Sequence, residues 1–132
     1  MDYEPFSGFD YRVDNFFMYP MVLEEYWREL SGSEQKVLDF ILRQTIGFRK
    51  EYDFISLSQF TNGVGGRSAN RGTGLSTSQV RRAIAKLEEK GFIRVERSPR
   101  RTSKFLLVTK QMLDDDRTGN FVDHFYQTMR NS

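Results

Sequence analysis

The side chains best suited to chemistry lie between residues 67 and 104, and they are suited to hydrogen bonding and charge pairing. Hydroxyl, amide and guanidinium groups follow one another in the segment Ser76-Thr-Ser-Gln-Val-Arg-Arg82. At the start of a helix in a DNA major groove, serine and threonine donate and accept, glutamine pairs with adenine and arginine pairs with guanine. A second basic group, residues 97–104, follows a turn later in the chain. Together they indicate a surface for nucleic acid.

The periodicity of the first segment says which side chains face outward. Val80, Ile84 and Leu87 form the inner stripe of a helix, which leaves polar and basic residues on the opposite side. Side chains at a hairpin tip would reach phosphates or the minor groove. We expect DNA contacts from Thr77, Ser78, Gln79, Arg81, Arg82 and Lys86 of the helix, Arg97, Arg100, Arg101 and Lys104 of the hairpin, and Arg67 and Arg71 of a preceding loop.

That loop, residues 63–74, holds five of the ten glycines. No Gly-Lys-Ser/Thr follows it and no Gly-x-Gly-x-x-Gly is complete, so we expect no nucleotide site there. We expect a mobile loop in the free protein that becomes more ordered on DNA, because basic loops can settle on phosphates.

Catalytic and metal-binding patterns are weak. His124 is the only histidine, cysteine is absent, and neither a catalytic triad nor a His-x-His motif can be assembled. Asp114-Asp-Asp116 lacks the loop that a hard cation needs, and we expect a solvated turn there. The sequence therefore predicts a protein that is not an enzyme and carries neither metal nor cofactor.

Charge is distributed unevenly along the 132 residues. Residues 61–110 carry twelve basic and three acidic side chains, whereas residues 1–60 carry six basic and eleven acidic ones. A basic block in an otherwise acidic chain favours a polyanion-binding face over a merely solvated surface. No apolar run reaches the length of a membrane span, and the acidic, aromatic N-terminus is unlike a targeting signal. We expect a cytoplasmic protein.

Capping patterns predict where the helices begin and end. We expect a first helix from Pro20 through Leu30, a second from Ser31 to a left-handed Gly47, a short one from Ser56 to Gly63, and another from Ser76 to Gly91. Strands are expected at Phe54-Ile55, at 93–97 and at 104–108, with a turn at 98–101. Helix, strand, helix, helix and basic hairpin form a winged helix-turn-helix, an α+β and mainly helical fold with a two- or three-stranded wing sheet.

Both ends of the chain carry groups of apolar side chains. Residues 1–19 hold seven of the nineteen aromatic residues, and Phe121, Val122, Phe125 and Met129 have helical spacing. We expect an aromatic arm over 1–19, a DNA-binding domain over 20–110 and a tail helix over 111–132. The arm and the tail helix are expected to dock on their own domain. The alternative for either is a homodimer contact, or for the tail a partner.

Three segments of the chain resemble the N-terminal domain of phage replication protein O. They are residues 26–48, 53–60 and 72–93, and the similarity extends over about 15–108. The most specific element is Arg43-x-Thr45-x-Gly47 followed by Ser56-Leu-Ser-Gln59, whereas Gly74-Leu-Ser and Leu87-Glu-Glu-Lys-Gly-Phe-Ile93 are shared with MarR-type and DnaD-like winged helices.

The resemblance implies a replication initiation protein of a phage or mobile element, acting in the cytoplasm of a bacterial cell or a phage-infected host. Such a protein would bind double-stranded origin DNA through its winged helix and help to recruit a helicase or helicase loader. Two alternatives remain: a transcriptional regulator with the same module, and a winged-helix interaction protein of the replisome that touches DNA weakly.

Overall fold

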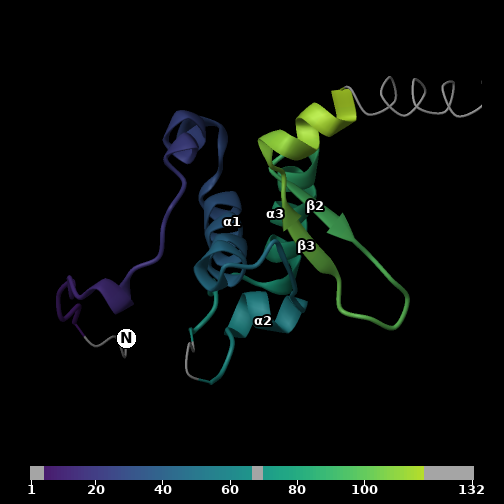
Figure 1. Ribbon diagram of the computed structural model, residues 1–132. Helices are drawn as coiled ribbons and strands as arrows, with labels where there is room; N and C mark the ends of the chain where they lie inside the picture. Colours follow the sequence, from purple (N-terminus) through teal and green to yellow (C-terminus); the bar gives the residue numbers. More distant parts are fainter. Residues whose placement is uncertain (1–4, 67–69, 118–132) are drawn as a thin grey trace, which may run out of the picture.

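The computed structural model describes residues 5–66 and 70–117 and shows an α+β, mainly helical domain, as the sequence predicts (Figure 1). Its elements in chain order, with η for a 3₁₀ helix, are η1 (Val13–Asn15), η2 (Met21–Glu29), α1 (Gly32–Gln44), η3 (Ile46–Phe48), β1 (Tyr52–Phe54), α2 (Leu57–Asn62), α3 (Thr77–Glu89), β2 (Ile93–Glu96) and β3 (Lys104–Leu107). Residues 110–117 are helical too.

The three α-helices begin at the serines that the sequence predicts. In each case the serine Oγ accepts from the backbone N–H three residues further on: Ser31 from Glu34 at 3.1 Å, Ser56 from Gln59 at 3.1 Å and Ser76 from Gln79 at 3.2 Å. In α2 and α3 the glutamine Oε1 also accepts from the serine N–H at 2.9 Å, which completes a capping box. Orphan donors are thereby satisfied at each helix start.

The end of α1 differs from the prediction. The left-handed residue is Arg49, with φ 57°, and not Gly47, because α1 tightens into η3 before the chain turns. Thr45 holds this turn, since its buried Oγ1 donates to the Ile41 carbonyl at 2.7 Å. Gly47 instead leaves room for the side chain of Arg43, because a Cβ at this position would lie 2.9 Å from the guanidinium. That guanidinium stacks over Phe48, with Cζ 4.7 Å from the ring centroid.

The sheet has three antiparallel strands in the order β1-β3-β2, the larger of the two sheets that the sequence allows. Phe105 of the central strand lies between Asp53 of β1 and Val95 of β2. The β2–β3 connection is the predicted hairpin, and Arg100 turns it with a φ of 66°. Helices α1, α2 and α3 with this hairpin are compatible with a winged helix.

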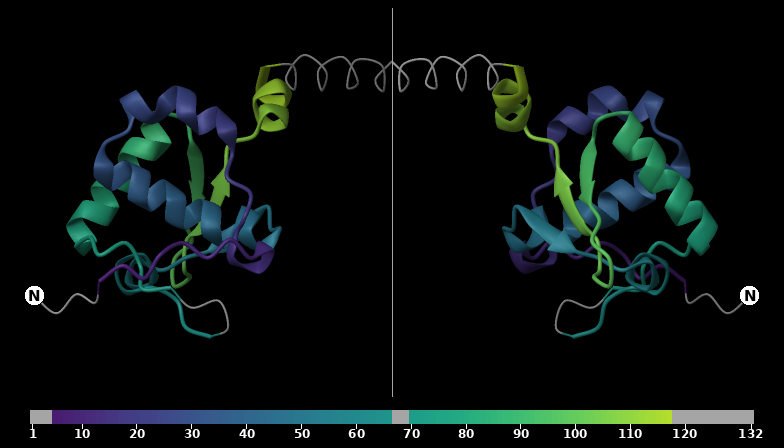
Figure 2. Two further views of the ribbon diagram at one scale, coloured as in Figure 1. Left: turned by 90° about the vertical axis from the view of Figure 1, so that its left-hand side faces the viewer. Right: turned by 90° about the vertical axis from the view of Figure 1, so that its right-hand side faces the viewer.

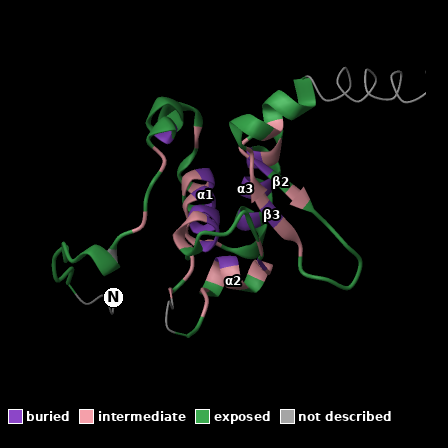
Figure 3. Ribbon diagram, viewed as in Figure 1, coloured by how far each residue is buried: buried purple, intermediate pink, exposed green. Residues whose placement is uncertain are grey.

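One hydrophobic core joins the helices to the sheet, and it lies mainly along the facing sides of α1 and α3 (Figure 3). Phe60 of α2 is fully buried at the centre of this core. The centroid of its ring lies 5.0 Å from the ring centroid of Phe40 and 5.1 Å from that of Phe105. The inner stripe of α3 is buried as predicted and consists of Val80, Ala83, Ile84 and Leu87.

The N-terminal part of the chain differs from the prediction in two respects. The helix expected from Pro20 through Leu30 is present over residues 21–29, but it is a 3₁₀ helix that buries only Leu23, and the side chain of Trp27 stays half exposed. The arm was expected to dock on its own domain, but its rings from Phe6 to Phe16 are exposed, and in Figure 1 it leads away from α1. At the root of the arm, Phe17 packs against the core.

The C-terminal segment also corrects a prediction. Asp114–Asp116, expected as a solvated turn, belongs to the helical residues 110–117, and Asp116 forms an ion pair with Arg94 of β2. This carboxylate–guanidinium pair ties the segment to the sheet. The predicted apolar stripe of the tail, Phe121 to Met129, lies outside the described residues.

Candidate nucleic-acid interface

The N-terminal half of α3 presents uncommitted polar groups to solvent. The capping box fixes the start of the helix, and the buried Val80 and Ile84 hold it against the core. Thr77, Ser78, Arg81 and Arg82 are exposed, and within the described residues neither arginine side chain forms a hydrogen bond or ion pair. Consecutive residues on a helix are about 100° apart, so the two guanidinium groups leave α3 on different flanks. Arg82 is on the α1 side, where it lines a shallow groove with Ser33.

Gln79 has a different environment from the other α3 residues. Its Oε1 accepts from the N–H of Ser76 at 2.9 Å as part of the capping box. A bidentate pair with adenine uses both the oxygen and the nitrogen of the glutamine amide. Gln79 can therefore make the expected adenine contact only if the capping hydrogen bond breaks. In the structure the side chain of Gln79 caps the start of α3.

The hairpin carries its free charges at the tip. Arg100 and Arg101 are exposed, and among the described residues neither guanidinium has a hydrogen-bond or ion-pair partner. The hairpin and loop 63–74 extend toward the same end of the domain, the end at which α3 begins, and helical residues 110–117 lie at the opposite end (Figure 2). The tip and the start of α3 could thus meet one ligand together.

Three of the predicted basic contacts are engaged within the chain. Arg97 makes a two-point contact with Glu88 of α3, at 3.1 and 2.7 Å, and this hydrogen bonding raises the pKa of Arg97 further. Lys104 lies over the Tyr52 ring, 4.0 Å from its centroid, with Glu96 at 3.5 Å. Lys86 pairs with Glu89 at 3.3 Å. These three lysine and arginine side chains would have to exchange partners to bind a phosphate.

Loop 63–74 is anchored at its base. Val64 pairs with Asn70 in an isolated antiparallel bridge, and the Thr73 N–H and Oγ1 both donate to the Phe60 carbonyl at 2.8 Å. Arg71 is exposed at this base, whereas Arg67 lies outside the described residues. The expected ordering of the loop on DNA stays a prediction.

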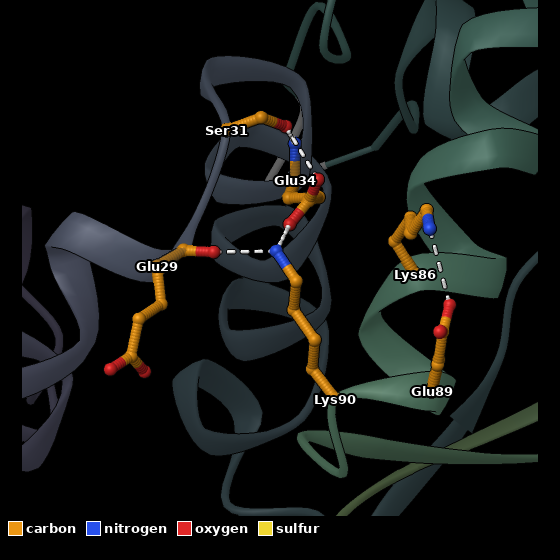
Figure 4. A network of polar contacts seen from close by, with 6 residues as sticks. All are labelled: Glu29, Ser31, Glu34, Lys86, Glu89 and Lys90. Carbon is orange, nitrogen blue, oxygen red and sulfur yellow. Dashed lines mark hydrogen bonds and ion pairs between the residues drawn. The ribbon is translucent and has the colours of Figure 1, made fainter.

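Sequence reasoning missed a network that positions α3. Lys90, at the C-terminal end of α3, donates to the Glu34 carboxylate of α1 and to the Glu29 carbonyl at the end of η2 (Figure 4). Ser31 Oγ donates to the other Glu34 oxygen at 2.8 Å. Burial raises the pKa of Glu34, but the hydrogen bonds from Lys90 and Ser31 outweigh it and lower the pKa below 4.5. The only sequence signal is the capping-box spacing of Ser31 and Glu34.

The described part of the chain offers few other kinds of site. In residues 5–66 and 70–117 no three His, Cys, Asp or Glu side chains gather in a way that could hold a metal ion. None of the helices described there is long and apolar enough to cross a membrane.

A family comparison adds the decisive observation. The model of the family described as bacteriophage replication protein O matches residues 15–110, which is more than half of the chain. The chain belongs to the bacteriophage replication protein O family. The match covers nearly the same residues as the resemblance in the sequence, and it gives this family member a function related to phage replication. No curated protein and no solved structure is significantly similar to the chain.

Proposed function

We propose that this chain binds double-stranded DNA at a phage replication origin and acts there as a binding protein, not as an enzyme. The observation that supports it most is the set of exposed, uncommitted groups at the start of α3. Thr77, Ser78, Arg81 and Arg82 lie on a firmly capped helix, at the same end of the domain as the hairpin tip. A helix presented in this way fits a major groove.

The proposed contacts are of two kinds, contacts to base edges and contacts to the phosphate backbone. Arg82 and Arg81 can each pair with the O6 and N7 of guanine, and Thr77 and Ser78 can donate to or accept from several base edges. Arg100 and Arg101 at the hairpin tip, with Arg71 at the loop base, meet the phosphate backbone on either side. The family membership supports an origin as the DNA, because it relates the chain to phage replication.

The first experiment compares variants on two DNA duplexes. A site is selected from a random pool, and affinities for it and for a scrambled duplex are measured at several salt concentrations. Arg82→Ala should weaken the selected site by about 1–3 kcal/mol and relax sequence preference. Arg100→Ala and Arg101→Ala should weaken both duplexes alike, each lowering the salt slope by about one phosphate.

The matched control is Arg28→Ala, which removes an exposed arginine of η2. It should change neither affinity nor salt slope. If Arg82→Ala loses equal affinity on both duplexes, Arg82 is only a phosphate contact. If none of the variants changes binding, the interaction-module alternative replaces the DNA-binding proposal.

Helicase recruitment is the second part of the proposal, and family membership is its support. The test is capture of the host replicative helicase or its loader by the purified chain on origin DNA, with the Arg28→Ala chain in parallel. Capture that needs both the chain and the origin supports recruitment. Equal capture on scrambled DNA would contradict an origin-directed role.

A further inference from the structure

The end of the domain that lies away from the start of α3 carries an exposed apolar surface. We call it the η2 surface, and it consists of four side chains of η2: Met21, Val22, Tyr26 and Trp27. These side chains are between 39% and 78% exposed. In Figure 2 η2 and helical residues 110–117 lie at one end of the domain, and the hairpin and loop 63–74 extend toward the other. Apolar side chains gathered in this way on one short segment are typical of an interaction site.

The 3₁₀ geometry of η2 explains why these side chains stay exposed. With three residues per turn, residues that are three apart lie in one row along the helix. Leu23 and Tyr26 share the row that faces the domain, where Leu23 is buried and the Tyr26 ring centroid lies 5.5 Å from that of Phe92. Met21 and Trp27 share a different row. Because one row of the three faces the core, the apolar residues of the other two rows need another cover.

The η2 surface has a fixed position on the domain. Lys90, at the end of α3, donates to the Glu29 carbonyl at the C-terminal end of η2 (Figure 4). At the other end of η2 the N–H of Leu23 donates to the Pro20 carbonyl at 3.2 Å. Since both ends and the buried Leu23 hold the helix in place, a ligand meets a preformed surface and does not have to order it.

The C-terminal part of the chain starts beside the η2 surface. The Val108 N–H donates to the carbonyl of Phe92 at 3.0 Å, and the ring of Phe92 is the one that contacts Tyr26. Thr109 then begins the helical residues 110–117, because its Oγ1 accepts from the Met112 N–H at 3.1 Å. Residues 118–132 therefore continue from a segment that lies at the same end of the domain as η2 (Figure 2).

Residues 118–132 have the composition and the length to cover the η2 surface. Their helical spacing brings four apolar side chains to one face, which we call the tail stripe: Phe121, Val122, Phe125 and Met129. A helix over 121–132 would be about 18 Å long, and the nine residues of η2 also extend over about 18 Å. Gly119 and Asn120 precede the stripe, and these are residue types at which helices end and the chain changes direction.

Two other occupants fit the η2 surface less well. Glu24 and Glu25 are exposed between its apolar residues, so the surface repels the phosphates of a nucleic acid. A separate protein with a similar stripe has to arrive from solution, whereas a short tether gives the tail stripe an effective concentration in the millimolar range. We propose that the tail stripe binds the η2 surface of the same chain and covers Trp27. This contact leaves the start of α3 free, so it does not depend on the proposed DNA binding.

Disulfide trapping in the full chain tests the contact directly. The chain has no cysteine, so two introduced cysteines form one defined pair. Met21→Cys is combined in turn with a cysteine at either end of the tail stripe, Phe121→Cys or Met129→Cys, and with a matched control on the opposite face, Asp123→Cys or Gln127→Cys. Oxidation is followed on non-reducing gels and by peptide mass spectrometry. A disulfide requires Cα atoms within about 7 Å, so an intrachain bond should form several-fold faster at one of the stripe positions than at both controls.

The fluorescence of Trp27, the single tryptophan, gives a second readout without cysteines. Phe121→Ser with Phe125→Ser removes two rings from the stripe, and Asp123→Ser with Gln127→Ser changes the opposite face as the control. The stripe variant should shift the Trp27 emission to longer wavelength and increase its quenching by acrylamide, and the control should match the wild type. Circular dichroism checks that both variants are folded.

Three results would overturn the proposal. The first is equal oxidation rates on both faces together with equal quenching of Trp27 in the wild type and the stripe variant. The second is a set of disulfides that form only between chains, which would assign the stripe to a second copy. The third is protection of Trp27 that appears only when a helicase or its loader is added, which would assign the η2 surface to that partner. Affinity for the selected duplex should be the same in the stripe variant and the wild type, so failure of this contact can be distinguished from failure of DNA binding.

Discussion

At the scale of single residues, the distinction that matters is between charges already paired within the chain and charges left free. Arg97 and Lys104 come from the same basic hairpin as Arg100 and Arg101, yet Glu88, Glu96 and the Tyr52 ring hold the first two. A phosphate must compete with these partners, whereas it meets Arg100 and Arg101 without competition. Counting basic residues therefore overstates the number of DNA contacts, and the free arginines of α3 and of the hairpin tip are the better candidates.

Glu34 of α1 helps to position α3, because its carboxylate pairs with Lys90, which also donates to the Glu29 carbonyl of η2. Because its pKa is lower in the folded chain than the ordinary 4.5, its contribution to stability is present above that pH and is lost as the pH falls through the folded value. Glu34→Gln should therefore unfold at lower urea concentration at neutral pH and lose less of its remaining stability on acidification than the wild type.

Urea titrations of both proteins between neutral and acidic pH measure this effect. Glu89→Gln is the matched control, because it removes a carboxylate from the exposed pair with Lys86, and such pairs contribute little. Parallel stability curves for Glu34→Gln and the wild type at all pH values would contradict the assigned role.

At the scale of elements, loop 63–74 shows how glycines shape the path from α2 to α3. Gly72 has a φ of +78°, and a Cβ there would lie 2.5 Å from the N of Gly63 and 2.8 Å from the O of Thr61. Gly74 has a similar φ of +74°, but a Cβ there would meet nothing within 4 Å. Position 72 thus requires glycine both for its positive φ and for the lack of a Cβ, whereas position 74 requires glycine for its positive φ alone.

This difference predicts unequal costs for two matched substitutions. Gly74→Ala should destabilise the fold by about 1–2 kcal/mol through backbone strain, and Gly72→Ala by clearly more, because backbone atoms would also have to move. Urea unfolding followed by the fluorescence of Trp27, the single tryptophan, measures both. Equal losses in the two variants would contradict the close approach of residues 63 and 72.

Sequence patterns predicted the elements that depend on neighbours in the chain. Ser31, Ser56 and Ser76 cap helices because each capping bond spans three residues, and the alternation around Ile93 and Val95 gives β2. Contacts between distant residues left no such pattern. Lys90 and Glu34 are 56 positions apart. The spacing predicts a left-handed helix end at Gly47, but the missing side chain at this position instead leaves room for the guanidinium of Arg43.

The candidate site was predictable in part for the same reason. Helical periodicity predicts that Ser78, Gln79, Arg82 and Lys86 face outward, and all four are exposed in the structure. Periodicity does not say which side chains find partners, so the capping bond of Gln79 and the Glu88 contact of Arg97 changed their interpretation. Docking of the arm on its own domain is a wrong prediction for the rings from Phe6 to Phe16, because apolar composition alone does not determine which surface covers a side chain.

At the scale of the whole molecule, the basic segment 61–110 supplies α3, the hairpin and the glycine loop. The start of α3, the hairpin and the loop lie toward one end of the domain in Figure 2, so their exposed arginines can act together.

The central claim is that this replication protein O-type chain reads a DNA sequence through α3, and the most direct measurement is a ratio of two affinities. The wild-type chain is titrated with its selected site and with a scrambled duplex of equal length and composition, at the same salt concentration near physiological. We predict that the selected site binds about 10³-fold tighter or more, as is typical of specific DNA-binding proteins. Equal affinity for the two duplexes would contradict sequence reading by this chain.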